Sequence, residues 1–142
     1  KLIDSSVWID YLFNGKHSNL IDSSDILLVS SLSIFEVKNK LRKSNIDENK
    51  INKSIDFIKK RGLIIEINIE IAEKAVDFSL QYKLPIIDSL IYTSAILNNV
   101  KLITLDNDFR GLKDVIILSW HLWKNLLFMM DYVFIVGILL RY

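Results

Sequence analysis

Cysteine is absent from the 142-residue sequence, and proline and glycine are scarce, with one and four residues respectively. The absence of cysteine excludes disulfide bonds and thiolate metal ligands, and it fits a reducing compartment, so we expect a cytoplasmic protein. Four scattered glycines provide no glycine-rich phosphate loop, and His17 and His121 are not spaced as metal ligands. Ser5 and Ser6 have no paired histidine that would activate a nucleophile. The carboxylates remain as the candidates for chemistry.

The composition, with 51% hydrophobic and 25% charged residues, predicts one globular domain with a sizeable core. Residues 1–10 contain two aspartates where a secretory signal needs an apolar core, so we expect no such signal. The net charge of +1 conceals a basic stretch at 38–61, which holds nine of the eighteen Lys and Arg residues against three acids. This stretch is suited to attract a polyanion, and a solvated helical hairpin is the alternative interpretation.

Short apolar runs alternate along the chain with longer segments of helical spacing. The runs are typical of buried parallel strands and lie at 2–3, 26–29, 63–67, 101–105 and 115–118. The helical segments lie at 7–13, 32–43, 50–60, 71–82 and 85–98. Pro85 suits a first helical turn, and Gly62 suits a helix end. Strands that alternate with helices predict an α/β fold whose parallel sheet is covered on both faces.

Acidic residues fall at or near the carboxyl ends of these predicted strands. They are Asp4, Glu36, Asp88 and Asp106, with Asp108 close behind. Ligands of open α/β sheets bind at this rim, so we expect the acids to converge there. Two charges about 4 Å apart repel by about 4 kcal/mol at an effective dielectric near 20, and a divalent cation removes that penalty. Oxygen ligands without cysteine or histidine suit Mg²⁺ or Mn²⁺.

Each acid also has a local structural explanation. Asp4 suits the N-cap of the following helix, and Ser33 with Glu36 matches a capping box. Asp88 in a first helical turn complements the helix dipole, and Asp106 begins an ordinary turn sequence. Their common position on one rim favours a shared site over four separate structural roles.

The same acids stand in four short motifs, LIDSSVWID at 2–10, SIFEV at 33–37, LPIIDSLI at 84–91 and LITLDNDF at 102–109. In order and spacing these motifs resemble those of PIN-domain ribonucleases, specifically the small VapC-type toxins of type II toxin–antitoxin systems. The resemblance covers residues 1–118, which we predict to be the nuclease domain. It implies a PIN-like three-layer α/β/α sandwich with a central, mainly parallel five-stranded sheet.

The resemblance also implies a site and a reaction, the metal-dependent cleavage of single-stranded RNA by an endoribonuclease. The implied catalytic residues are Asp4, Glu36, Asp88 and Asp106, which with Asp108 would hold Mg²⁺ or Mn²⁺, while Ser6 and Thr104 would orient ligands or water. VapC-type proteins usually form homodimers and are silenced by a cognate antitoxin protein. We add Lys38 and Arg42, which follow Glu36 on the same predicted helix, as predicted RNA-binding residues.

Two other functions stay open, a PIN-domain nuclease of RNA maturation or decay and a non-catalytic RNA-binding module. A missing acid would mark the non-catalytic module, and none is missing. Residues 119–142 form an apolar tail beyond the point where such toxins normally end. A packing or dimer-forming helix, a membrane anchor and a foreign segment are the three interpretations. Asp131 would cost about 2.5–3.5 kcal/mol inside a bilayer, so the membrane anchor is disfavoured.

Overall fold

The computed structural model describes residues 1–118, which contain a five-stranded sheet of order β3-β2-β1-β4-β5. The strands are β1 (Leu2–Ile3), β2 (Leu27–Ser30), β3 (Gly62–Ile65), β4 (Leu102–Thr104) and β5 (Val115–Ile117). All four neighbouring pairs are parallel, so every strand ends at the same rim of the sheet. The predicted five-stranded parallel sheet is confirmed.

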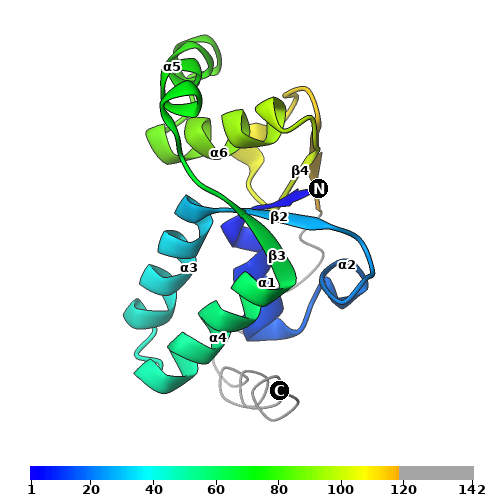
Figure 1. Cartoon of the computed structure of the whole chain (residues 1–142), viewed down its shortest axis with the longest axis vertical. Helices are drawn as coiled ribbons and strands as arrows, with labels where there is room; N and C mark the ends of the chain where they lie inside the picture. The colour runs from blue at the N-terminus through cyan, green and yellow to red at the C-terminus, as the bar shows by residue number, and fades with distance from the viewer. Residues whose placement is uncertain (119–142) are drawn as a thin grey trace.

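Helices cover both faces of this sheet (Figure 1). They are α1 (Ser5–Asn14), α2 (Ser18–Ile21), α3 (Ser31–Lys43), α4 (Glu48–Arg61), α5 (Ile69–Tyr82) and α6 (Ile86–Leu97), and a short 3-10 helix, η1, spans Asn107–Phe109. Helices α1, α3 and α4 lie on one side and α5 and α6 on the other, which confirms the three-layer α/β/α arrangement. The single turn α2 was not predicted, because four residues are too few to show a helical period.

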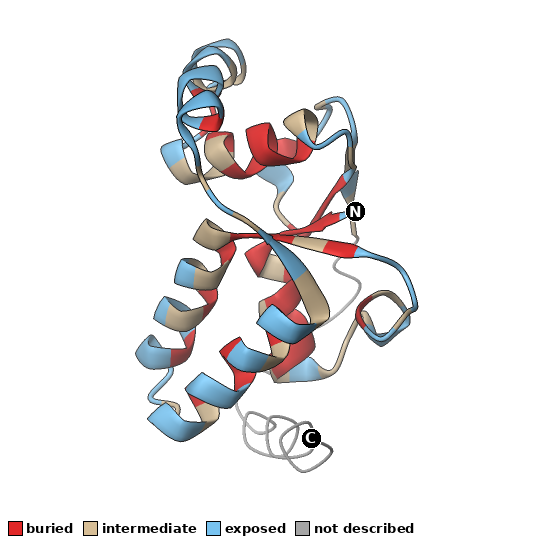
Figure 2. Cartoon of the chain, in the orientation of Figure 1, coloured by how far each residue is buried: buried red, intermediate tan, exposed pale blue. Residues whose placement is uncertain are grey.

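Alternating strand residues supply two separate cores, one on each face of the sheet (Figure 2). Ile3 and Ile103 pack with α1, α3 and α4, whereas Leu2 and Leu102 pack with α6. All four side chains are at most 3% exposed. Strands of this kind are apolar on both sides, which is why the sequence shows continuous apolar runs rather than alternation.

Strand β3 departs from the predicted pattern of buried strands, because Leu63 is 62% and Ile64 38% exposed. It pairs only with β2, so it forms an edge of the sheet. Gly62 does follow α4 directly, but its φ of −128° is extended rather than left-handed. A Cβ at Gly62 would lie 2.5 Å from Val29 Cγ2, so this glycine permits the close approach of β3 to β2.

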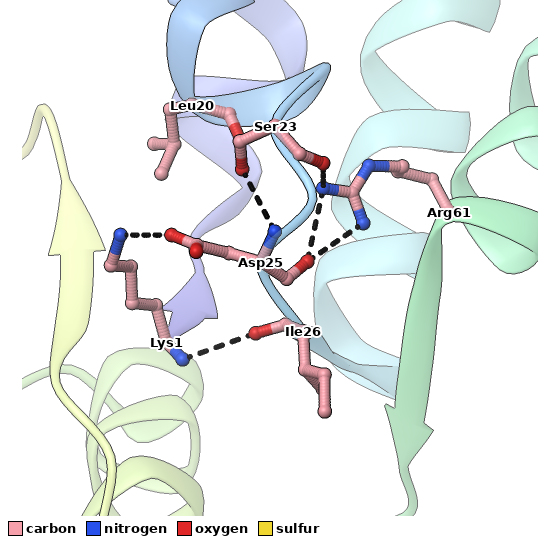
Figure 3. A network of polar contacts seen from close by, with 6 residues as sticks. All are labelled: Lys1, Leu20, Ser23, Asp25, Ile26 and Arg61. Atoms are coloured by element: carbon pink, nitrogen blue, oxygen red, sulfur yellow. Dashed lines mark hydrogen bonds and ion pairs between the residues drawn. The ribbon is translucent and has the colours of Figure 1, made fainter.

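Arg61, the last residue of the basic stretch, has a structural role beside the loop that leads into β2 (Figure 3). Its guanidinium donates to the carbonyl oxygens of Ile21, Ser23 and Asp25 and so fixes the loop between α2 and β2. The Asp25 carboxylate in turn pairs with the Lys1 ammonium. This network holds the start of β2 beside β1.

No helix within residues 1–118 is long and apolar enough to cross a membrane. The predicted apolar tail at 119–142, which includes His121, lies outside the described residues, and the end of the nuclease domain at residue 118 stays a prediction.

Candidate metal and active site

Asp4 lies at the centre of the site, directly after β1, and is 5% exposed. It caps α1 as predicted, because its Oδ2 accepts a hydrogen bond from the Ser6 amide at 3.3 Å. The same oxygen accepts from Ser6 Oγ at 2.5 Å and from Thr104 Oγ1 at 2.8 Å. Among residues 1–118 every bond to this carboxylate reaches Oδ2, which leaves Oδ1 available to a ligand.

Ser6 and Thr104 also connect the first strand to the fourth. Ser6 Oγ accepts from the Leu105 amide at 3.0 Å, and Thr104 Oγ1 accepts from the Asp106 amide at 2.9 Å. The two hydroxyls are 3.3 Å apart. They therefore hold Asp4 and the backbone of Asp106 in one fixed arrangement, and the predicted role of both residues in orienting ligands or water stays a prediction.

Glu36 faces the same rim from the second turn of α3. Its Oε2 accepts from Ser5 Oγ at 2.7 Å, a contact that the sequence did not predict. The capping box proposed as an alternative role for Glu36 is wrong, because α3 begins at Ser31 with Ser30 as its N-cap. Burial raises the pKa of the Glu36 carboxyl against the effect of the Ser5 bond, and repulsion from Asp4 and Asp106 adds to the rise.

Three further aspartates stand together at the mouth of the site. Asp88 lies in the first turn of α6, and Asp106 caps η1 by accepting from the Asp108 amide at 2.9 Å. One carboxylate oxygen from each of Asp88, Asp106 and Asp108 lies within 4.8 Å of the others. Asp88 and Asp106 are half-buried and Asp108 is exposed, so this group opens to solvent.

The pKa of Asp88 responds to the charges of all the other acids of the site. Burial raises its pKa from 3.8 to about 7, and repulsion contributes from Asp106, Asp4, Glu36 and Asp108, in that order. The five acids Asp4, Glu36, Asp88, Asp106 and Asp108, here called the acidic site, are therefore brought together as the sequence predicted.

The negative charge of the acidic site is not balanced by a basic side chain among residues 1–118. None of its members forms an ion pair with a lysine, arginine or histidine of residues 1–118. At about 5 Å and an effective dielectric near 20, each fully charged pair costs about 3 kcal/mol. The donors are all carboxylate oxygens, and three of them lie close enough to share one ion, so the residues fit a hard divalent cation such as Mg²⁺ or Mn²⁺.

The predicted RNA-binding residues Lys38 and Arg42 are directed elsewhere. Arg42 Nη2 lies 2.7 Å from a carboxylate oxygen of Glu48 on α4, and Lys38 Nζ lies 3.9 Å from the same oxygen. His17 pairs with the buried Asp10 at 2.9 Å. The structure therefore brings the predicted acids and hydroxyls together, but it does not direct these two basic side chains at them.

The matched family model is the PIN domain, which covers residues 1–115. A toxin–antitoxin complex from Klebsiella pneumoniae is similar to the chain at 28% identity and a TM-score of 0.67, over 81% of this chain and 94% of that one. VapC20 of Mycobacterium tuberculosis, a sarcin-ricin loop cleaving toxin, is 13% identical with a TM-score of 0.62, over 76% and 91% of the two chains. VapBC2 of Rickettsia felis, bound to a DNA fragment from its promoter, is 19% identical with a TM-score of 0.64, over 84% and 97%. No curated protein sequence matches the chain.

The chain belongs to the PIN domain family, because the family model covers most of its length. Proteins of this family are generally nucleases that use divalent metal ions. The structural neighbours are VapC toxins and toxin–antitoxin complexes, which agrees with the resemblance found in the sequence motifs.

Proposed function

We propose that the protein is a toxin-type endoribonuclease that hydrolyses single-stranded RNA with Mg²⁺ or Mn²⁺. The observation that carries this proposal is the acidic site itself, five mutually repelling carboxylates at one rim without a paired cation among residues 1–118. The repulsion within such a cluster destabilises the folded state, and a bound divalent cation would remove that repulsion and stabilise the fold. The family and the 28%-identical toxin–antitoxin complex support the nuclease and toxin parts of the proposal.

The proposed ligands are Asp4, Glu36, Asp88 and Asp106, with Asp108 as a further one. A bound divalent cation would supply Lewis acidity that activates water and stabilises charge on a phosphodiester. The residues of the chain would set the geometry. Ser6 and Thr104 orient the Asp4 carboxylate, and Ser5 orients Glu36, because each of these hydroxyls donates to a carboxylate oxygen of the site.

The approach to the site suits a flexible strand of RNA. Asp4 is buried at its base, whereas Asp108 is exposed at its mouth. A scissile phosphate can therefore approach from solvent while its flanking nucleotides cross the surface of α3 and α6. An unpaired strand fits this approach, because its backbone bends freely and its bases are accessible.

The cognate antitoxin and a second copy of the chain are the proposed protein partners. The antitoxin is supported by the toxin–antitoxin complex from K. pneumoniae, to which the chain is 28% identical. Exposed apolar residues on β3 and near the end of α5 offer surfaces for such contacts, since Leu63 and Leu80 are each more than 60% exposed. Co-expression with any short reading frame found next to the gene, followed by size and mass analysis, tests both partners.

The test of the activity is cleavage of single-stranded RNA by the purified full chain. We expect cleavage with Mg²⁺ or Mn²⁺, none with EDTA, and restoration when the cation is returned in excess. Asp88→Asn should reduce the rate by orders of magnitude while the circular dichroism spectrum stays unchanged. The matched control is Asp56→Asn, which removes an exposed aspartate of α4 and should cut normally. Normal cleavage by Asp88→Asn would refute the assignment of the site.

A further inference from the structure

One aromatic side chain lies in water while the others of the described chain are packed. Phe35 is 59% exposed, and it is the only aromatic residue among the exposed large hydrophobic residues of residues 1–118. Trp8, Tyr92 and Phe109, by contrast, are at most 1% exposed. An exposed phenylalanine gains little from burial and is a weaker helix former than leucine or alanine, so neither packing nor helix propensity explains this one.

Phe35 lies on the helix that supplies Glu36 to the acidic site. It directly precedes Glu36 on α3, a helix that starts at the rim where β2 ends. The side of α3 that carries Ser33, Val37 and Leu41 is buried. At about 100° per residue, Phe35 points away from that buried side, about 100° around the helix from Glu36. Its ring therefore lies on the solvent side of the same turn that supplies a proposed ligand.

The charges around the site favour RNA binding through a contact that is not ionic. The acidic site repels the phosphates of an approaching strand, and Lys38 and Arg42 share their charge with Glu48. Stacking of a nucleic-acid base on an aromatic ring does not depend on neutralising phosphates, and single-stranded RNA offers unstacked bases. An exposed ring one residue from Glu36 is placed to supply that contact.

We propose that Phe35 is a stacking platform for one base of the RNA that flanks the scissile phosphate. The inference rests on the proposed ribonuclease function and deepens it, because it makes Phe35 a positioning residue that selects unpaired RNA. A base held in a duplex cannot leave its own stack without cost, so a paired strand would lose this contact. All four bases have a π-face, and the contact therefore distinguishes unpaired from paired RNA rather than one base from another.

The experiment measures RNA binding in the Asp88→Asn background, which prevents cleavage, with the divalent cation present. The variants are Phe35→Ala, Phe35→Leu and Phe35→Trp, and the matched control is Ile69→Ala. Ile69 is 77% exposed at the start of α5. The start of α5 lies near Leu97, at the end of α6, whereas Asp88 lies in the first turn of α6. Each variant is titrated with a labelled single-stranded oligonucleotide and with a series in which one base at a time is abasic.

We expect Phe35→Ala to weaken binding by about 5- to 100-fold, Phe35→Leu to weaken it nearly as much, and Phe35→Trp to bind at least as tightly as phenylalanine. The loss from Phe35→Ala should vanish on the oligonucleotide that lacks the stacked base. With Asp88 intact, Phe35→Ala should raise KM and leave kcat within about twofold, because the contact is made equally in the ground and transition states. Ile69→Ala should change none of these quantities.

Three outcomes would overturn the inference, and they separate it from the proposed function. If the unsubstituted chain cuts RNA and Phe35→Ala binds as tightly as phenylalanine, the platform is refuted and the ribonuclease stands. If Phe35→Leu preserves affinity and no abasic position cancels the effect, the ring does not stack on a base and the platform is refuted. If the unsubstituted chain neither binds nor cuts RNA, the proposed function fails and the inference fails with it.

Discussion

Neutralising Asp88 should stabilise the metal-free protein at alkaline pH. The folded state raises the pKa of this carboxyl from 3.8 to about 7, so the folded chain binds the proton more tightly than the unfolded chain. The contribution of Asp88 to stability is therefore fully present below about pH 4 and is lost as the pH rises through about 7. At pH 8 the wild-type protein carries the full cost of this charge, and Asp88→Asn does not.

The size of the effect follows from the same shift. The folded and unfolded pKa values of Asp88 differ by about three, which corresponds to about 4 kcal/mol at roughly 1.4 kcal/mol per pKa unit. Asp88 is only half-buried and stands at an open mouth, so solvent screening and small movements of its neighbours reduce this figure. We expect Asp88→Asn to raise the free energy of unfolding by about 1–2 kcal/mol at pH 8, and by clearly less at pH 5.

The assay is urea unfolding in EDTA, followed by circular dichroism, for the wild-type protein, Asp88→Asn and the control Asp56→Asn. Asp56 is exposed on α4, so its neutralisation should change the free energy of unfolding by less than about 0.5 kcal/mol at both pH values. Equal or lower stability of Asp88→Asn at pH 8, or a gain that does not depend on pH, would refute the account of charge repulsion at this site.

Three further predictions follow from the contacts of the site and its surroundings. Thr104→Val removes the donor to Asp4 and the acceptor of the Asp106 amide, so it should lower stability by about 1–2 kcal/mol and activity by about 10- to 100-fold. Thr104→Ser should retain most of both, and equal cleavage rates for the two variants would contradict this role of Thr104. Lys38→Ala with Arg42→Ala, in the Asp88→Asn background, should weaken RNA binding and reduce its salt slope by less than the roughly 1.4 of two full phosphate contacts, because Glu48 shares both charges; an unchanged slope would leave both residues as partners of Glu48 only. Mg²⁺ at 100 times its dissociation constant should stabilise the wild-type fold by about 2.7 kcal/mol and Asp88→Asn by much less in thermal melts, and equal shifts would place the ion elsewhere.

The convergence of the acids could be predicted because it depends on topology alone. Asp4 and Asp106 follow apolar runs directly, and parallel strands in one sheet end at the same rim. Glu36 lies near the start of α3, which follows β2 directly, and Asp88 lies in the first turn of α6. The approximate place of both residues therefore follows from the alternation of strands and helices. These relations require only the order of the elements, which the apolar pattern supplies.

The remaining features depend on contacts between elements that are distant in the sequence. Ser5 donates to Glu36 across 31 residues, and only the packing of α1 beside α3 makes this bond possible. The pairing of Arg42 with Glu48 likewise requires the turn from α3 to α4, so the basic stretch looked more available in the sequence than it is. The exposure of Leu63 follows from the position of β3 at the edge of the sheet, which apolar character alone does not reveal.

The most direct test of the central claim follows metal occupancy and RNA cleavage in the same samples. Mn²⁺ is titrated into EDTA-treated, dialysed protein, its binding is read by electron paramagnetic resonance, and cleavage of a single-stranded RNA is read in parallel. The account predicts that cleavage rises with occupancy of the acidic site and that Asp88→Asn loses both, while Asp56→Asn keeps both. Cleavage that proceeds without bound Mn²⁺, or Mn²⁺ binding that Asp88→Asn leaves unchanged, would contradict it.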